Sequence, residues 1–276
     1  MGNNCKKLRE ALFASLLIGV IVSWVADAQS PKGIDPSILT KAKAGDATAQ
    51  VAVAKAYVSG RGVPQDFKKA SQWYLNAAEQ GNAEAESMIG TAYFLGSGVP
   101  LDCTKAVEWW RKAGEQGNTG ALSLLAMAYE KGEEGKGLCV TQNFTQAAFW
   151  YRKAADLGDY YAEYKLALLY DIGSGVPQNQ TQAVALYRDA AEKGVAGAQY
   201  MLGMKYASGR FITQNLTEAY FWLDLAASGK LEDIKQEDIA KERDAVAIHL
   251  SSAVLMDTQE RARKWAEDHP PKTSPE

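Results

Sequence analysis

The chain has little of the material from which most enzyme sites are built. Its 276 residues include only two histidines, His249 and His269, and three cysteines. Two histidines in one terminal segment give almost nothing for a general base or a metal cluster. The motifs of zinc proteases, phosphate-binding loops and serine hydrolases are absent from the sequence. We therefore expect no catalytic residues, no bound metal and no cofactor, and we predict that the protein is not an enzyme.

The sequence also lacks an excess of positive charge. Lysine and arginine number 30 against 33 aspartates and glutamates, for a net charge of −3. A protein that binds nucleic acid needs a basic face for the phosphate backbone. We accordingly expect no nucleic-acid partner.

No apolar run is long enough for an ordinary membrane span. An uncharged run rich in Leu, Ile and Val, Ala11 to Val25, follows a positive segment with Lys6, Lys7 and Arg9 and precedes the small-residue motif Ala26 to Ala28. This order is typical of a secretory signal peptide over residues 1–28, cleaved after Ala28. The alternative is a single membrane anchor, which needs about 20 apolar residues. We predict cleavage, and a periplasmic or secreted mature protein.

What the sequence has in abundance is a repeated unit. Glycines that open each copy recur at intervals of 36, 36, 41, 36 and 35 residues: Gly45, Gly81, Gly117, Gly158, Gly194 and Gly229. Five tyrosines keep the same register: Tyr57, Tyr93, Tyr129, Tyr170 and Tyr206. The units are 45–80, 81–116, 117–157, 158–193 and 194–229. A period in this range is typical of a solenoid, in which each unit buries its apolar face against the next.

Each unit is predicted to be a helix hairpin. In the second unit, apolar residues at helical spacing end at Gly96, and a second apolar set follows Asp102. Asp102 is expected to cap the second helix, and Asn143, Asn179 and Asn215 align with it, so we interpret them as caps too. The pattern assigns Tyr93 and Trp109 to the core. We call the two helices of each unit helix A and helix B.

The repeat has a family resemblance. Gly-x-Gly-Val-Pro loops at residues 60–64, 96–100 and 173–177, together with aromatic pairs of helix B at 73–74, 109–110 and 150–151, resemble the Sel-one-like repeat, a relative of the tetratricopeptide repeat. The resemblance implies an all-α fold, a right-handed α-solenoid of about five hairpins that serves as an adaptor or scaffold. Residues 29–44 would form a linker and N-terminal capping helix, and residues 230–269 the C-terminal capping helices. We expect the tail, 270–276, to be disordered.

Two cysteines remain once a leader is removed. Cys103 begins a helix B, and Cys139 ends a loop in the third unit that is five residues longer than its counterparts. Stacked hairpins bring such loops within about 10 Å of each other, and an exported protein permits disulfides. A Cys103–Cys139 bridge and two separate thiols are both compatible with the sequence.

One side of the A helices is unusually apolar. The residues opposite the core positions are candidates for a partner-binding concave groove: Met88, Phe94, Leu124, Met127, Tyr164, Leu168, Tyr200, Met201 and Met204. Aromatic and Met-rich surfaces on solenoids mark partner sites. The alternative, which the sequence leaves open, is that half of these residues pack between adjacent hairpins.

These features predict an exported monomeric adaptor that holds a protein or peptide. Membrane contact would come only through an uncleaved leader or a membrane-protein partner. Similar secreted proteins of the resembled family suggest two narrower roles. One is a periplasmic immunity protein that neutralises a toxic effector, and the other is a regulator that restrains a membrane sensor.

Overall fold

A computed structural model describes residues 33–132, 140–229 and 234–269. This described part contains thirteen helices and no strand, which confirms the predicted all-α class. The chain divides into two compact units, Met1–Trp150 and Tyr151–Glu276, which we call the N-terminal and C-terminal units. The predicted leader, Cys139 and the predicted tail lie outside the described residues, so those predictions stay predictions.

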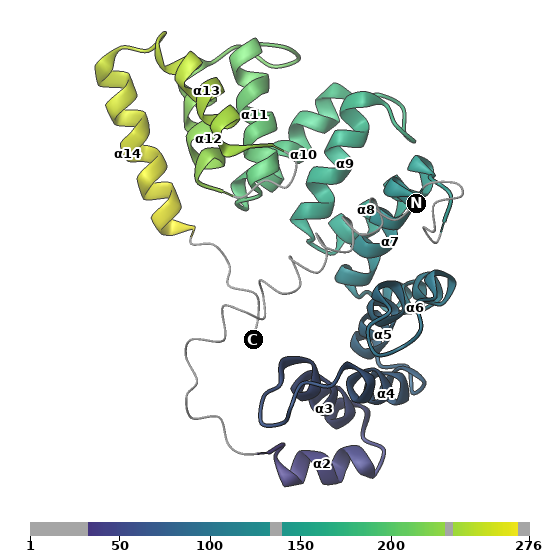
Figure 1. Cartoon of the computed structure of the whole chain (residues 1–276). Coiled ribbons are helices and arrows are strands. Elements are labelled where there is room, and N and C mark those ends of the chain that lie inside the picture. The colour runs from purple at the N-terminus through teal and green to yellow at the C-terminus, as the bar shows by residue number, and fades with distance from the viewer. Residues whose placement is uncertain (1–32, 133–139, 230–233, 270–276) are drawn as a thin grey trace. The chain divides into compact units, whose positions relative to one another are not determined.

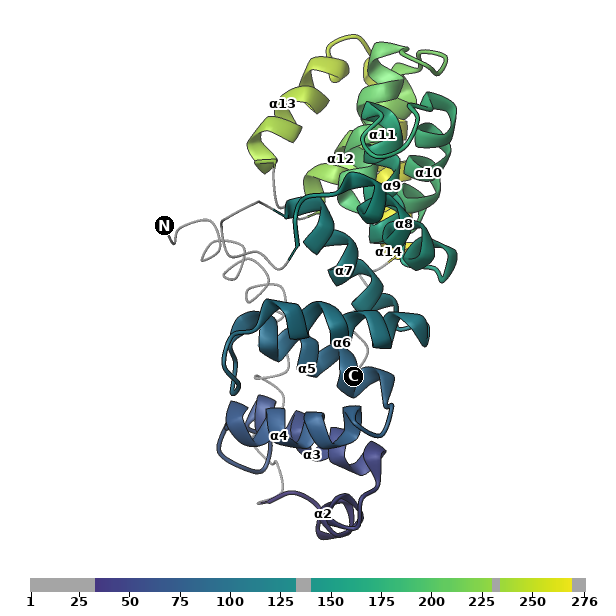
Figure 2. The same ribbon diagram turned by 90° about the vertical axis from the view of Figure 1, so that its right-hand side faces the viewer.

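The N-terminal unit is a succession of helix pairs. Figures 1 and 2 both show α3 with α4 as one layer and α5 with α6 as the next. The helices are α2 (Pro36–Lys43), α3 (Ala47–Ser59), α4 (Phe67–Ala78), α5 (Ala83–Leu95), α6 (Cys103–Glu115), α7 (Thr119–Lys131) and the first part of α8 (Phe144–Asp156). Helix α2 covers the open end of the first pair through Ala42, which is buried against Val53.

The C-terminal unit holds the remaining pairs and two further helices. They are the end of α8, α9 (Tyr160–Ile172), α10 (Gln180–Glu192), α11 (Ala196–Ser208), α12 (Leu216–Ser228), α13 (Gln236–Ala247) and α14 (Ser252–Asp268). Helix α14, yellow in Figure 1, packs on α12, where the Trp222 and Trp265 rings meet edge to face at 6.3 Å. Helix α13 also packs on α12, through an ion pair of 3.1 Å between Arg243 and Asp224.

Side-chain caps start the B helices as predicted. Asp102 accepts a hydrogen bond from the backbone amide of Lys105 at 3.0 Å. The predicted caps Asn143, Asn179 and Asn215 do the same at their own helices. Because each oxygen satisfies an amide that the helix itself cannot pair, Asp and Asn are interchangeable at this position.

Glycine ends the B helices for two different reasons. Gly81 and Gly117 adopt positive φ, 80° and 85°, the left-handed conformation that reverses the chain after a helix. Gly229, the aligned glycine after the last repeat, instead has a φ of −87°. A Cβ atom there would lie 2.5 Å from the Cβ of Ala196, so this position needs glycine for close packing and not for its backbone angle.

The prediction that Tyr93 and Trp109 are core residues was wrong in part. Trp110 is 1 % exposed, whereas Trp109 and Tyr93 are half-buried and pack against the edge of a cluster of buried residues. Trp110 shares its helix face with the buried alanines Ala106 and Ala113, four positions before it and three after it. The neighbouring Trp109 is therefore turned toward the boundary of the core.

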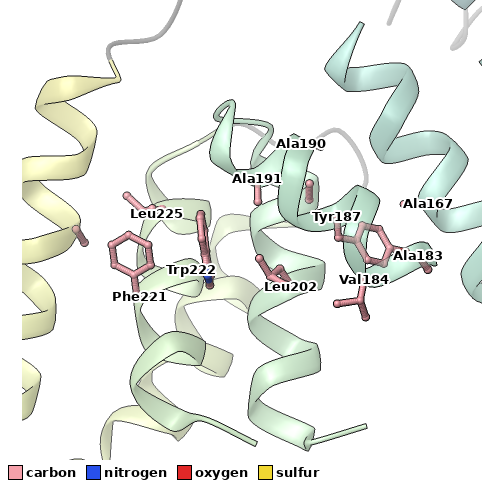
Figure 3. Close-up of a cluster of buried hydrophobic side chains, with 12 residues drawn as sticks. Ala167, Ala183, Val184, Tyr187, Ala190, Ala191, Leu202, Phe221, Trp222 and Leu225 are labelled. Atoms are coloured by element: carbon pink, nitrogen blue, oxygen red, sulfur yellow. The ribbon is translucent and has the colours of Figure 1, made fainter. Parts of the chain in front are cut away.

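The C-terminal unit has an aromatic core. Figure 3 shows side chains of α10, α11 and α12 gathered in one cluster, with Trp222 beside Leu202 and Phe221 on the side of α14. The guanidinium of Arg261, from α14, lies 3.8 Å from the centre of the Phe221 ring. Burial of these large rings fixes the last repeat against its capping helix.

Candidate partner-binding surface

The described residues contain no cluster of three or more His, Cys, Asp or Glu side chains that could hold a metal ion. Within the same part of the chain, no helix has both the length and the apolar character needed to cross a membrane. His249 and His269 are both exposed, and His269 stacks on Trp265 with ring centres 4.2 Å apart. The candidate functional surfaces of the described residues are therefore the faces of the helices.

The nine predicted groove residues all lie on A helices, and we call the solvent-facing side of the A helices in each unit the A-helix face. Eight of them are half-buried. In the N-terminal unit, Met88 packs against a buried cluster of α3 to α5, and Leu124 and Met127 lie on α7. Most of the predicted row thus has one side against the core and one side toward solvent.

Phe94 is the residue for which the prediction was wrong. It is 5 % exposed, and its ring packs on Trp110 with centres 5.3 Å apart. Position 94 directly follows Tyr93 and turns toward helix B of its own hairpin, where the large indole fills the space. Phe94 is a core residue and is not available to a partner.

Tyr200 and Met204 are shared with a capping helix. Both pack against a cluster that includes Val246 of α13. Burial, followed by the nearby carboxylates of Glu242 and Asp238 on α13, raises the pKa of Tyr200. The last helices, which do not follow the repeat, therefore cover part of the A-helix face on α11.

Tyr164, Leu168 and Met201 form the central part of the A-helix face in the C-terminal unit. All three pack at the edge of the aromatic cluster. Tyr164 lies against Gly197 so closely that an added Cβ atom would be 2.6 Å from its ring, and its ring centre is 6.3 Å from that of Tyr187. Glycine at position 197 therefore lets α11 approach α9 around this tyrosine.

Tyr161 belongs to this face and was missed. It is 36 % exposed, its ring centre lies 6.1 Å from that of Tyr164, and the ammonium of Lys165 is 6.0 Å from its ring. Residues 161, 164 and 168 follow helical spacing, so the sequence contained the signal. Tyr161 is the most exposed aromatic residue of the row.

A second feature missed from the sequence is Phe211, in the loop between α11 and α12. It is the one non-glycine residue with positive φ (67°) in the described part of the chain, and it is 58 % exposed. The aligned positions in the first, second and fourth repeats are glycines. The break in the Gly-x-Gly pattern at Phe211 was the available signal.

A polar network joins three helices of the C-terminal unit. Lys205 Nζ lies 2.7 Å from Asp171 Oδ1 and donates to Gln180 Oε1 at 3.0 Å. The hydroxyl of Tyr187 donates to Asp171 Oδ2 at 3.2 Å. The Lys205 and Asp171 side chains are nearly buried, so each charge depends on the other for compensation.

Two aligned glutamates, Glu86 and Glu163, differ in whether a buried carboxylate oxygen accepts a hydrogen bond. Glu86 is buried, but Gln116 donates to its carboxylate at 2.7 Å. Oε2 of Glu163 is buried and has no hydrogen-bond partner within the described residues. Burial, and then the negative charge of Asp189, raise the pKa of Glu163 to about 6, against an opposing effect of Lys193.

Comparisons with known proteins place the chain in a family. A family model of the Sel1 repeat matches residues 47–82, 83–118, 120–159, 161–195 and 196–230. The chain is 34 % identical to a Sel1 repeat protein from Oxalobacter formigenes of known structure, with a TM-score of 0.65 over 71 % of this chain and 79 % of that one. No curated protein matches it in sequence.

Two other solved structures are similar to this chain. One is c5321, a protective antigen of uropathogenic Escherichia coli strains with an SLR fold, at 27 % identity and a TM-score of 0.56; the match covers 86 % of this chain and 56 % of that protein. The other is the immunity protein Pa5087 from Pseudomonas aeruginosa, at 18 % identity and a TM-score of 0.43 over 83 % and 84 % of the two chains.

The five matched segments cover more than half of the sequence and coincide with the helix hairpins of an α-solenoid, a scaffold suited to protein interaction. The protein belongs to the Sel1 repeat family.

Proposed function

We propose that the protein is an exported adaptor that binds a protein or peptide through the A-helix face of its C-terminal unit. The binding surface is formed by Tyr161, Tyr164 and Leu168 of α9 with Met201 of α11. The function requires no metal, cofactor or nucleic acid. Export rests on the leader pattern of residues 1–28.

The observation that carries the proposal is the exposure of Tyr161 at the end of this row. Tyr161 is 36 % exposed, and its ring centre lies 6.1 Å from that of the half-buried Tyr164. Tyrosine and methionine are enriched in protein interfaces because they offer a large apolar area with few rotatable bonds or with an adaptable shape. The buried Tyr187 ring packs beneath Tyr164, with ring centres 6.3 Å apart, and supports the row from the core side.

A photocrosslinking residue in place of Tyr161 tests the proposal. In cells that export the protein, this variant should form one discrete covalent adduct. Leu157, 54 % exposed at the end of helix α8, provides the matched control on a B-helix end, and the same residue there should form none. A Leu168→Glu change in the crosslinking variant should weaken the adduct while the circular dichroism spectrum is retained.

The identity of the adduct separates the narrower roles. A toxic effector as the partner would indicate an immunity protein, and a membrane sensor would indicate a regulator. Equal adducts from positions 161 and 157 would contradict the proposed surface. A protein recovered from the cytoplasm with Met1 intact, shown by N-terminal sequencing, would contradict export.

A further inference from the structure

In the loop from Gly209 to Asn215, Phe211 replaces the second glycine of the Gly-x-Gly pattern. In the first, second and fourth repeats, the third loop position is glycine with φ of 73°, 75° and 71° at Gly62, Gly98 and Gly175. Phe211 has the same conformation, with φ of 67°. A non-glycine side chain is strained there because its Cβ atom crowds the backbone. The loop therefore keeps the geometry of the repeat while it carries an unfavourable residue.

The Phe211 side chain is not held in the core. It is 58 % exposed, whereas at Gly98 even a Cβ atom would collide with the carbonyl oxygen of Phe67 at 2.0 Å. Strain that has no structural purpose is more common at functional positions than elsewhere. An exposed aromatic ring on a strained loop thus points to an external contact.

Two cationic side chains lie near the Phe211 ring, but only one of them pairs with a carboxylate among the described residues. Lys205 Nζ is 5.3 Å from the ring centre and pairs with Asp171. The guanidinium of Arg210 is 5.9 Å from the ring centre, and it makes no hydrogen bond or ion pair within the described part of the chain. The loop therefore presents a fork of N–H donors next to an apolar ring.

A second apolar side chain lies nearby. Ile172, the last residue of α9, is 67 % exposed and directly follows Asp171. Since Lys205 contacts both Asp171 and the Phe211 ring, the end of α9 and the loop meet around one ion pair. Phe211 and Ile172 are thus two exposed apolar groups beside one uncompensated guanidinium.

We propose that this corner, formed by Phe211, Arg210 and Ile172, is a second docking site, for an acidic peptide segment of a partner protein. A carboxylate of the segment would accept a bidentate hydrogen bond from Arg210, and an adjacent apolar side chain would pack on Phe211 and Ile172. The site is separate from the A-helix face and does not depend on it.

The competing explanation is that the ring only shields the Lys205–Asp171 pair from water. The two explanations predict opposite behaviour of Phe211→Gly, which restores the residue of the other repeats. If the ring is a docking group, this change should retain or raise the thermal unfolding midpoint, since the backbone strain is relieved. If the ring is a shield, the midpoint should fall.

Selection of random phage-displayed peptides on the purified protein tests the site. We expect enrichment of peptides with Asp or Glu next to an apolar residue. Phe211→Gly and Arg210→Glu should each weaken binding of a selected synthetic peptide more than about tenfold, as for an anchor residue. The matched control is Arg61→Glu, which reverses the charge at the same loop position of the first repeat, beside Gly62, and should leave binding unchanged.

Three results would overturn the inference: no enrichment of acidic peptides, equal effects of Arg210→Glu and Arg61→Glu, or unchanged binding by Phe211→Gly with a lower midpoint. Tyr161→Glu should leave peptide binding at this corner intact. Loss of the crosslink at position 161 and loss of peptide binding at Phe211 are therefore separate outcomes, and either proposal can fail alone.

Discussion

Two tyrosines at the same repeat position behave differently in the two units. Tyr74 in the first repeat and Tyr187 in the fourth are both buried, and burial raises the pKa of both phenols. The Tyr187 hydroxyl donates to Asp171, but the Tyr74 hydroxyl has no hydrogen-bond partner within the described residues. The repeat fixes where the ring lies, and a residue outside the consensus decides whether its polar atom is satisfied.

The difference between the two tyrosine hydroxyls originates in one pair of aligned positions on successive A helices. In the C-terminal unit the pair is Asp171 and Lys205, and in the N-terminal unit it is Val58 and Ala92, which pack in an apolar cluster. The same space between successive A helices is therefore filled by ions in one unit and by hydrocarbon in the other. A repeat scaffold tolerates both because each interface is local to its two hairpins.

The largest effect is expected for Lys205→Ala. This change leaves the Asp171 carboxylate nearly buried without its cation, which costs about 3 to 5 kcal/mol of unfolding free energy. The double variant Asp171→Val with Lys205→Ala copies the Val58–Ala92 pair and should recover most of that loss. Urea unfolding followed by tryptophan fluorescence measures both. If Lys205→Ala lowered the unfolding free energy by no more than the loss of an exposed ion pair does, about 1 kcal/mol or less, the network would be hydrated.

The two tyrosines provide the next test. Tyr187→Phe removes a hydrogen bond to a carboxylate and should cost about 1 to 2 kcal/mol. Tyr74→Phe removes a hydroxyl that has no partner within the described residues, so it should be neutral or slightly stabilising. Thermal unfolding of the two variants side by side gives the difference. Equal losses would mean that the Tyr74 hydroxyl binds an ordered water.

A third pair of positions compares the loops. Gln178 donates from its side chain to the carbonyl oxygen of Asp171 at 2.8 Å, and Gln65 and Gln214 make the same contact in their own repeats. The second repeat has Leu101 there, 47 % exposed. Leu101→Gln should add a bond to the carbonyl of Phe94 and stabilise the fold by about 0.5 to 1 kcal/mol. Gln178→Leu is the reverse change and should lose a similar amount in the same denaturation assay.

The sequence predicted what the repeat encodes. The caps at Asp102 and Asn179 follow from backbone requirements that each hairpin meets alone, and the all-α class followed from the repeat and the family it resembles. The prediction of Phe94 as a surface residue failed because burial depends on which neighbour fills the space, here the Trp110 indole. These tertiary contacts are not periodic, and helical spacing does not report them.

The candidate surface was predictable to a similar degree. Tyr164, Leu168 and Met201 lie on one face, as their spacing indicated. The sequence did not indicate that α13 covers part of α11 at Tyr200, because α13 lies outside the repeat. Phe211 was visible as a break in a glycine pattern, but only the structure shows that the loop retains positive φ there.

The smallest effect is expected for the aligned glutamates, Glu86 and Glu163. Here the residue of the C-terminal unit, Glu163, has the buried carboxylate oxygen without a hydrogen-bond partner among the described residues. The pKa of Glu163 is raised to about 6 from an ordinary value of 4.5. Between these values the folded protein binds more protons than the unfolded chain, so stability should fall as pH rises from 4.5 to about 6. Solvent screening of this half-buried group limits the loss to less than about 1 kcal/mol.

Glu163→Gln should remove that pH dependence and stabilise the protein at neutral pH. Glutamine is the residue at the aligned positions 50 and 199, where its side chain donates to the carbonyl eight residues earlier at 3.2 Å. A glutamine introduced at position 163 would reach the carbonyl of Ala155 in the same way. Glu86→Gln is the control, and it should change the pH profile less, because Gln116 already donates to Glu86. Identical unfolding midpoints for wild type and Glu163→Gln from about pH 4 to about pH 7 would show that Glu163 is hydrated in solution.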